Sequence, residues 1–451
     1  MKTQKTLQTG FPKGIIFLLS LVIFPGMILL SQDAMEDYKV KPEEKKQVID
    51  SVALFMKEKY VFPDKGEEMA RMVLKNLKDG KYDEISDPQD FATALTKDLQ
   101  SVNHDRHIGV RYNPEMIALI KKGQNEETKK EAEEYMKKRQ EHVNFNFEEI
   151  KILPGNVGYL KFNSFMDASN AGPTAIAAMN FLSHTDALII DLTDNGGGSP
   201  SLIQLITTYF FEEPKHINSF YIREGEKTEQ FWTLTYVPGE RMTETDIYVL
   251  TSGFTFSGAE EFTYNLKNMK RAVIVGETTG GGAHPVNQHI INDNFGVSIP
   301  FGKAVNPITN ANWEGAGIEP HVKAEKSMAL DVAYVMALDS LLKKEGNEDV
   351  KQELAWVKEG LQAKLHPFNL DEKKLKDFVG VYGPRKITLE DGQLYYQREN
   401  RPKMKMIPMS EDLFMLDELA YFRIRFIREN GRIVALEGHY DNGTVDKNDK
   451  S

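Results

Sequence analysis

The chain has 451 residues, of which 41% are hydrophobic and 27% are charged, a composition that is typical of globular proteins and excludes wholesale disorder. Lysine and arginine number 56 against 67 aspartates and glutamates, so the net charge is −11. Without a dense basic stripe, such a chain is a poor candidate for nucleic-acid binding, because neutralised phosphates supply most of that affinity. The lack of cysteine excludes disulfides, thiolate metal sites and cysteine nucleophiles.

Residues 1–34 predict an exported protein. Lys2, Lys5 and Lys13 precede the apolar run Gly14–Leu30, which is typical of a secretory signal peptide or a short membrane anchor. In a helix the run would span roughly 25 Å, which is marginal for a bilayer. We therefore expect a periplasmic or extracellular protein, or one anchored so that it faces outside the cytoplasm, which meets the membrane only if this segment is uncleaved.

The remaining chain divides into segments by its pattern. Residues 40–115 show apolar side chains at helical spacing, and residues 116–150 are dominated by lysine and glutamate, so we expect an N-terminal helical subdomain and a charged helical connector. Between residues 151 and 345, β-rich runs alternate with helical stretches, which predicts an α/β core. Residues 366–451 contain short strands broken by hairpin dipeptides such as Asp391-Gly392, which predicts a small all-β domain.

The first of three polar loops in the α/β core follows the strand ALIID. Its three glycines allow backbone torsions that are closed to other residues, so that amide N–H groups can converge on an anion or a developing oxyanion; they are Gly196, Gly197 and Gly198. Taken alone, the loop is more typical of a phosphate loop or a tight turn, although no Walker lysine follows. We expect Asp191 and Asn195 to shape this loop.

The second and third loops supply candidate reactive side chains. A strand ends at Thr251 and a helix begins near Gly258, which places Ser257 at a helix N-terminus, where negative charge on an oxygen is favoured. Ser257 also fits a plain N-cap, with Glu260 completing a capping box. In the third loop, His284 fits either a base or a loop histidine bonded to backbone.

Together these segments resemble a known family. The motifs GYLKFNSF, ALIIDLTDNGGG, YVLTSGFTFSGAEEF, AVIVGETTGGGAHP and NPITNANWEGAGIEPHV occur in the order found in the S41 family of serine peptidases, over roughly residues 45–345. The resemblance implies a crotonase-like ββα peptidase core. The C-terminal segment more loosely resembles the lipocalin-like β-domain appended to many exported serine hydrolases, which implies either an accessory role near substrate or a stability module.

Two differences from the C-terminal processing peptidases indicate the branch of this family that the chain resembles. The C-terminal processing peptidases use a Ser–Lys dyad and usually carry a PDZ domain. Here the corresponding loop, Thr278–Gly282, has no lysine, and the stretch between Tyr112 and Ile152 is too short, too charged and too helical for a PDZ domain. Both features resemble the tricorn-like branch and the interphotoreceptor retinoid-binding protein-like branch.

The resemblance assigns the site residues. It implies Ser257 as the nucleophile, His107 as the base and Glu314 as the acid that orients the base, with His284 as the alternative base. The implied oxyanion donors are the backbone N–H of Gly258 and one from Gly196 or Gly197. Where the tricorn-like pattern has a serine before the histidine, this chain has Arg106.

The spacing of two histidines also raises the alternative of a metal site. His104 and His107 have the spacing H-x-x-H, but a third ligand in a matching context and the HExxH motif are both missing. We therefore expect no metal and no organic cofactor.

The expected function is that of an exported serine peptidase that cleaves peptides or unfolded protein through an acyl-enzyme, with no nucleic-acid partner. One alternative is a non-catalytic protein that binds a hydrophobic ligand such as a retinoid or lipid on the same fold. Another is an exported esterase or amidase.

Overall fold

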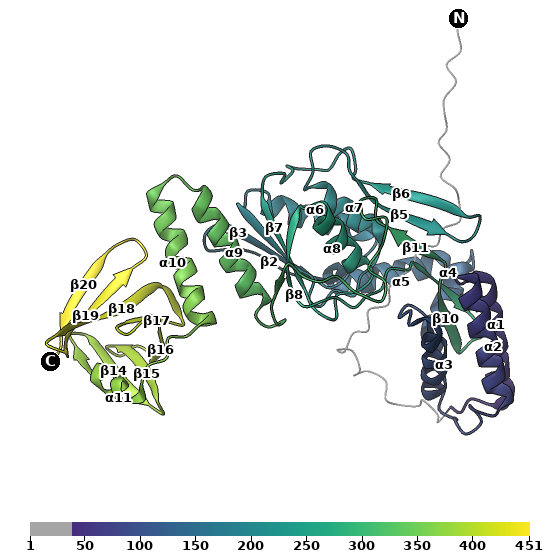
Figure 1. Cartoon of the computed structure of the whole chain (residues 1–451), viewed down its shortest axis with the longest axis horizontal. Coiled ribbons are helices and arrows are strands. Elements are labelled where there is room, and N and C mark those ends of the chain that lie inside the picture. The colour runs from purple at the N-terminus through teal and green to yellow at the C-terminus, as the bar shows by residue number, and fades with distance from the viewer. Residues whose placement is uncertain (1–37) are drawn as a thin grey trace, which may run out of the picture.

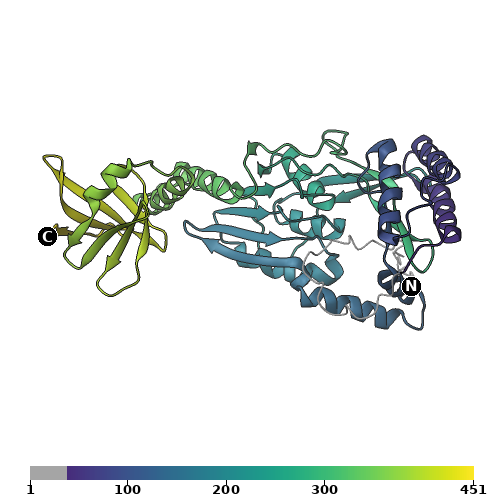
Figure 2. The ribbon, with the colours of Figure 1, turned by 90° about the horizontal axis from the view of Figure 1, so that it is seen from below.

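The computed structural model describes residues 38–451, which form an elongated molecule (Figure 1). N-terminal helices lie at one end, an α/β core lies in the middle, and a β-sheet domain lies at the other end (Figures 1 and 2). The expected signal peptide or anchor, residues 1–34, lies outside the described residues. Within the described part of the chain, no helix is both long enough and apolar enough to cross a membrane.

The N-terminal region is a helical layer in which each of the first helices begins with proline, a residue that is favoured at the first helical position. These helices are α1 (Pro42–Lys59), α2 (Pro63–Lys78) and α3 (Pro88–Asn103). Their apolar faces share one buried cluster with β10 (Phe295–Pro300), and β1 (Gly109–Tyr112) pairs antiparallel with that strand. The helical layer is therefore joined to a distant part of the chain by both packing and strand pairing.

Two helices rich in charged residues, α4 (Pro114–Gln124) and α5 (Lys129–His142), follow β1, and the short 3-10 turn η1 (Asn144–Asn146) leads into the core. Each of the two helices buries a single residue, Ile117 and Ala132. Their remaining faces are therefore exposed or only half-buried.

The core is a six-stranded sheet of order β12-β8-β7-β4-β3-β2, in which all neighbours are parallel except β2 and β3. Its strands are β2 (Phe147–Leu153), β3 (Val157–Phe162), β4 (Ala187–Asp191), β7 (Asp246–Thr251), β8 (Ala272–Gly276) and β12 (Val322–Lys323). The pair β2–β3 and the helix after it form a ββα unit. This arrangement confirms the predicted α/β class.

Helices cover both faces of this sheet. One face packs against α6 (Ala168–Leu182), α7 (Pro200–Thr208) and α8 (Gly258–Asn268), and the other packs against α9 (Ala329–Lys344) and α10 (Glu348–Leu365). Alternate residues of β4 enter the two apolar clusters, Leu188 on one side and Ile189 on the other. Because every residue of β4 is buried, its sequence is a continuous apolar run.

Two small antiparallel sheets flank the core. They have the orders β1-β10-β9 and β11-β5-β6. Their remaining strands are β5 (His216–Ile222), β6 (Lys227–Trp232), β9 (Val286–Ile290) and β11 (Gly302–Val305). The loops that follow β4, β7 and β8 leave the same edge of the parallel sheet, where ligands bind in open α/β folds.

The C-terminal region is an eight-stranded antiparallel sheet whose strands follow chain order. A bridge between Tyr382 and Lys450 joins its first strand to the end of its last, so the sheet approaches a closed barrel. Arg423 of this sheet stacks 3.8 Å from the Trp356 ring centroid on α10. The elements are α11 (Glu372–Leu375), η2 (Lys376–Phe378), β13 (Gly380–Tyr382), β14 (Arg385–Glu390), β15 (Gln393–Arg398), β16 (Met404–Pro408), β17 (Leu413–Leu416), β18 (Leu419–Glu429), β19 (Arg432–Tyr440) and β20 (Val445–Asp449).

Candidate active site

Ser257 lies between β7 and α8 with an unusual backbone. Its φ is 53° and its ψ is −119°, whereas an ordinary N-cap residue is extended with negative φ. Such a conformation costs a non-glycine residue on the order of 1–3 kcal/mol and persists only where its surroundings fix it. One fixing contact is the hydrogen bond from the Ser257 amide to Glu260 Oε2 at 2.9 Å, as the capping-box pattern predicts.

Glu260 does more than the capping box requires. Its carboxylate also accepts hydrogen bonds from the amides of Gly281 and Gly282, at 2.7 and 2.8 Å, and from the Thr279 hydroxyl. Burial raises the pKa of Glu260, and these donors offset that rise only in part. The side chain therefore ties the third glycine loop to the strained turn that carries Ser257, a role that the sequence pattern did not indicate.

The structure brings His107 to Ser257 across 150 residues of chain, with Nε2 3.0 Å from Oγ. His107 lies in the loop between α3 and β1. Its backbone N–H donates to Asp105 Oδ1 at 3.0 Å, and its ring packs against Phe256 with centroids 4.6 Å apart. Burial, which the nearby Asp105 offsets only in part, lowers the pKa of His107 to about 4. The imidazole is therefore neutral at pH 7, as a general base must be.

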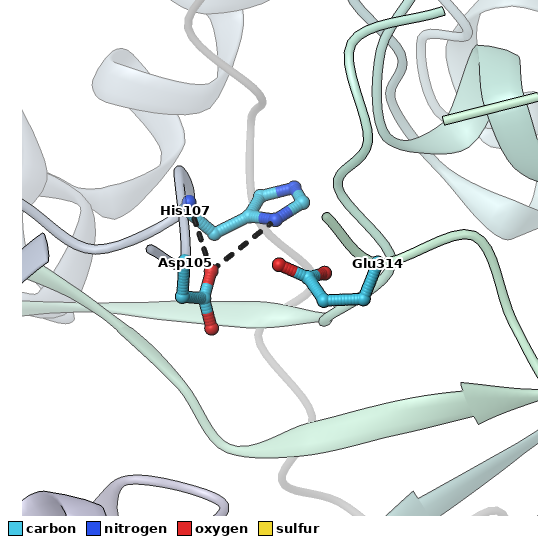
Figure 3. Close-up of side chains that lie close together, drawn as sticks. All are labelled: Asp105, His107 and Glu314. Carbon is cyan, nitrogen blue, oxygen red and sulfur yellow. Dashed lines mark hydrogen bonds and ion pairs between the residues drawn. The ribbon is translucent and has the colours of Figure 1, made fainter. Parts of the chain in front are cut away.

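Two carboxylates lie on the other side of this ring (Figure 3). A ring nitrogen of His107 and one oxygen from each of Asp105 and Glu314 lie within 4.8 Å of one another. Figure 3 shows the Glu314 carboxylate directed toward the imidazole. His107 Nδ1 is 3.9 Å from Asp105 Oδ1, and neither Nδ1 nor the buried Glu314 Oε1 has a hydrogen-bond partner among residues 38–451. The unpaired nitrogen and the unpaired oxygen thus belong to side chains of the same group.

The alternative base, His284, has a different environment. Its Nδ1 bonds Asp105 Oδ2 at 2.7 Å and lies 3.4 Å from Glu314 Oε2, and its ring meets the edge of Phe62. No hydrogen bond joins it to Ser257 in the described chain. His284 therefore bridges the two acids, which disfavours it as the base.

The two carboxylates, Asp105 and Glu314, differ in their pKa values. Burial would raise the pKa of Asp105, but the hydrogen bond from His284 and the electrostatic interactions with His284 and His107 hold it below its usual value. Burial and the neighbouring Asp105 raise the pKa of Glu314 to about 7. Asp105 is consequently the carboxylate that stays ionised, and Glu314 titrates near neutrality. No sequence pattern singled out Asp105, whose only signal is its place two residues before His107.

The expected oxyanion donors differ in whether their amides already have an acceptor. The Gly196 amide donates to Asn163 O at 3.3 Å, and the Gly197 amide donates to Asn195 Oδ1 at 2.9 Å, so both are occupied. The amides of Gly198 and Gly258 have no acceptor within the described residues. The Asn195 side chain shapes the loop by accepting the Gly197 amide. The amide without an acceptor is therefore that of the next residue, Gly198.

Close backbone approach explains the glycine at position 198. Its φ is +146°, and a Cβ there would lie 2.0 Å from Phe165 O. A Cβ on Gly258 would lie 2.8 Å from the Gly198 nitrogen. Absence of side chains at both positions lets the two free amides approach each other beside Ser257.

A cavity opens next to this serine. No residue of the C-terminal sheet lines it. Its lining consists of Gly198, Ser199, Pro200, Phe220, Ile222, Glu229, Phe231, Ser257, Gly258, Glu261, Gly282, Ala283, His284, Pro285, Val286, Asn287, Phe301 and Trp313.

The metal alternative finds little support in these contacts. His104 caps α3 in a left-handed conformation, and it does not join His107 in a ligand cluster in the described part of the chain. The donor group that does form, Asp105, His107 and Glu314, is engaged with Ser257, His284 and the Ala283 amide. The arrangement suits proton transfer from a hydroxyl.

Comparison with known proteins decides the family. The sequence model of Peptidase family S41 matches residues 156–324, and the model of the N-terminal domain of Peptidase_S41 in eukaryotic IRBP matches residues 42–154. The chain belongs to peptidase family S41. The second match also agrees with the branch that the sequence indicated.

Curated relatives of this S41 chain are processing proteases. It is 23% identical over 204 residues to carboxy-terminal processing protease CtpB of Bacillus subtilis, covering 45% of this chain and 41% of that protein. It is 26% identical over 201 residues to the chloroplastic carboxyl-terminal-processing peptidase 2 of Arabidopsis thaliana, covering 40% and 35%. The match thus spans less than half of each relative. A solved lipoprotein from Streptococcus agalactiae is 14% identical, with a TM-score of 0.45 and coverage of 69% of this chain and 100% of that one.

Proposed function

We propose that this S41 chain is a serine peptidase that hydrolyses peptide bonds through an acyl-enzyme on Ser257. The observation that carries the proposal is the 3.0 Å contact between His107 Nε2 and Ser257 Oγ. A serine hydroxyl is a weak nucleophile at neutral pH and needs a base within hydrogen-bond reach. A buried, neutral imidazole at this distance supplies that base.

In the first half of the reaction, Ser257 Oγ attacks the scissile carbonyl as His107 Nε2 takes its proton. The amides of Gly258 and Gly198 receive the oxygen that becomes negative, and one such donor is worth roughly 3–4 kcal/mol. His107 then gives the proton to the leaving amine. In the second half, water attacks the acyl-enzyme by the same route in reverse and restores Ser257.

The acids act through the histidine. When His107 becomes positively charged, the buried ring needs a negative neighbour, and Glu314 faces its unpaired Nδ1. Asp105, whose pKa is held below its usual value, supplies a second carboxylate at 3.9 Å from Nδ1. We therefore assign Glu314 as the residue that orients and stabilises the imidazolium, and Asp105 as the residue that positions both the loop of His107 and the ring of His284.

We further propose peptides or unfolded protein as the substrates and an exported location for the reaction. Family membership supports the substrate class, and the basic and apolar pattern of residues 1–34 supports export. Exported, the chain would act where loosely structured polypeptide is accessible outside the cytoplasm.

The test is proteolysis of an unfolded protein by purified residues 35–451, with wild type compared with Ser257→Ala and the products read by mass spectrometry. We expect cleavage by wild type only, and covalent labelling of Ser257 by a serine-directed phosphonate. Circular dichroism establishes that both proteins are folded. Cleavage that survives Ser257→Ala contradicts the assignment of the nucleophile. A folded wild type that neither cleaves nor is labelled contradicts the peptidase proposal and favours the ligand-binding alternative.

A further inference from the structure

The cavity beside Ser257 has apolar walls and an acidic character. Aromatic and aliphatic side chains form most of its surface, among them Phe220, Phe231 and Trp313. Its titratable lining residues, apart from the serine, are Glu229, Glu261 and His284, and no lysine or arginine lines it in the described residues. An occupant with an apolar stem and a positive end would therefore match this lining.

Glu261 is the feature that points to such an occupant. It lies four residues after Ser257, in the first turn of α8, and both residues line the cavity. Glu261 is only 3% exposed, yet its Oε1 is buried without a hydrogen-bond partner in residues 38–451. The Asn218 amide on β5 lies close enough to Glu261 to offset part of the effect of burial on its pKa. Glu261 Oε1 itself still lacks a partner in the described residues, and because buried polar groups are nearly always paired, it marks the place where a donor on a ligand would bind.

The position of the cavity relative to Ser257 indicates which substrate side chain it would receive. Gly198 and Gly258, whose amides are the proposed oxyanion donors, line the cavity together with Ser257, whereas His107 does not. The leaving amine departs toward the base that protonates it. The side chain next to the carbonyl held by these amides consequently points toward the cavity.

Resting on the proposed peptidase function, we propose that Glu261 selects substrates with lysine or arginine on the acyl side of the scissile bond. The aliphatic stem of that residue packs among the apolar walls, and its positive end pairs with the Glu261 carboxylate. A site built around a buried polar group rejects an analogue that leaves the group unpaired. Burial raises the pKa of Glu261 to about 8, and Asn218 offsets this rise only in part. A cation bound beside the carboxylate would favour its ionised form.

The test uses two diphenyl phosphonates that differ only in the side chain, lysine or norleucine, and measures their rates of labelling of Ser257 in residues 35–451. We expect the lysine reagent to react at least tenfold faster with wild type. In Glu261→Gln the ratio should fall at least tenfold, while the norleucine rate stays within threefold. Glu229→Gln is the matched control: this carboxylate also lines the cavity but is already paired with Lys227, and the ratio should change by less than threefold.

A second measurement needs no variant. Benzamidine, a cation, should protect wild-type Ser257 from the norleucine reagent at a concentration at least tenfold below that of its neutral analogue benzamide. Labelling without a lysine preference, a ratio unchanged by Glu261→Gln, or equal protection by the two compounds overturns this inference and leaves the proposed function intact. Absence of labelling by both reagents in folded wild type overturns both.

Discussion

Asp105 accepts a hydrogen bond from His284 Nδ1 at 2.7 Å, and its other oxygen accepts the backbone N–H of His107 at 3.0 Å. A fully buried carboxylate therefore fixes both histidines of the site, although it lies 179 residues away from one of them. A third contact, from the Tyr60 hydroxyl at 3.0 Å, attaches this carboxylate to the N-terminal helical layer. Asp105 thus links the helices to the catalytic loops.

Replacing Asp105 with asparagine should reduce both activity and stability. The amide still accepts the His107 backbone N–H but cannot offset a positive charge, so we expect kcat/KM to fall about 10²-fold. The free energy of unfolding should fall by about 1–3 kcal/mol, because a buried partner of His284 is weakened. Peptide cleavage and urea unfolding measure the two effects. Asp98→Asn is the control, since that carboxylate bonds Tyr82 and Lys81 away from the site and should affect stability alone.

The pH dependence of kcat/KM should follow the ionisation of Glu314. Its pKa of about 7 makes the carboxylate ionised chiefly above neutrality, and only the ionised form stabilises the imidazolium. His107, with a pKa of about 4, is already neutral in this range. We therefore expect kcat/KM to rise with pH roughly between pH 6 and 8, as the free enzyme loses this proton. In Glu314→Gln the rise should disappear and the plateau should fall about 10²-fold. If kcat/KM of Glu314→Gln still rises near pH 7, a group other than Glu314 titrates there.

Gly198→Ala should damage the oxyanion site. The added Cβ would lie 2.0 Å from Phe165 O, so the loop must shift and carry its free amide away from Ser257. Loss of one such donor lowers kcat roughly 10²–10³-fold. Gly225→Ala is a matched control, because Gly225 also has positive φ, +76°, but a Cβ there meets no atom within 4 Å. It should show the backbone strain without the catalytic loss, and equal kcat values for the two variants would refute the role of Gly198.

Glu260→Gln should destabilise the turn that carries the nucleophile. Glutamine presents only one acceptor oxygen to the Ser257, Gly281 and Gly282 amides, so at least one buried donor loses its partner. An unsatisfied buried group costs about 1–3 kcal/mol, which chemical denaturation resolves. Because Ser257 then relaxes from its strained conformation, phosphonate labelling should slow as well. Unchanged stability together with full labelling would contradict this account.

The sequence supported the chemistry of the site better than its fine geometry. The family resemblance predicts Ser257, His107 and Glu314 as the site residues, and these roles stay predictions; the first two are in contact, and Glu314 lies beside the ring. The α/β class followed from the alternation of β-rich and helical runs, and every residue of the run ALIID is buried. These features depend on local pattern and on motif order, both of which are visible in a single chain.

What the sequence left open depends on contacts between distant residues. The choice of Gly198 over Gly196 or Gly197 depends on where Asn195 and Asn163 accept their hydrogen bonds. The pairing of His284 with Asp105 joins two loops that the chain order does not relate. No pattern in the sequence indicated Glu261, because its importance comes from the burial of Oε1 without a hydrogen-bond partner in the described residues.

The shared apolar core of the N-terminal helices and β10 has a consequence for when activity begins. His107 and Asp105 precede the parallel sheet in the chain, and they reach Ser257 only after β1 has paired with β10. A partly folded chain, even one with a complete central sheet, holds its nucleophile without a base. Under the proposed mechanism, hydrolysis therefore requires the long-range pairing of β1 with β10 as well as the central sheet.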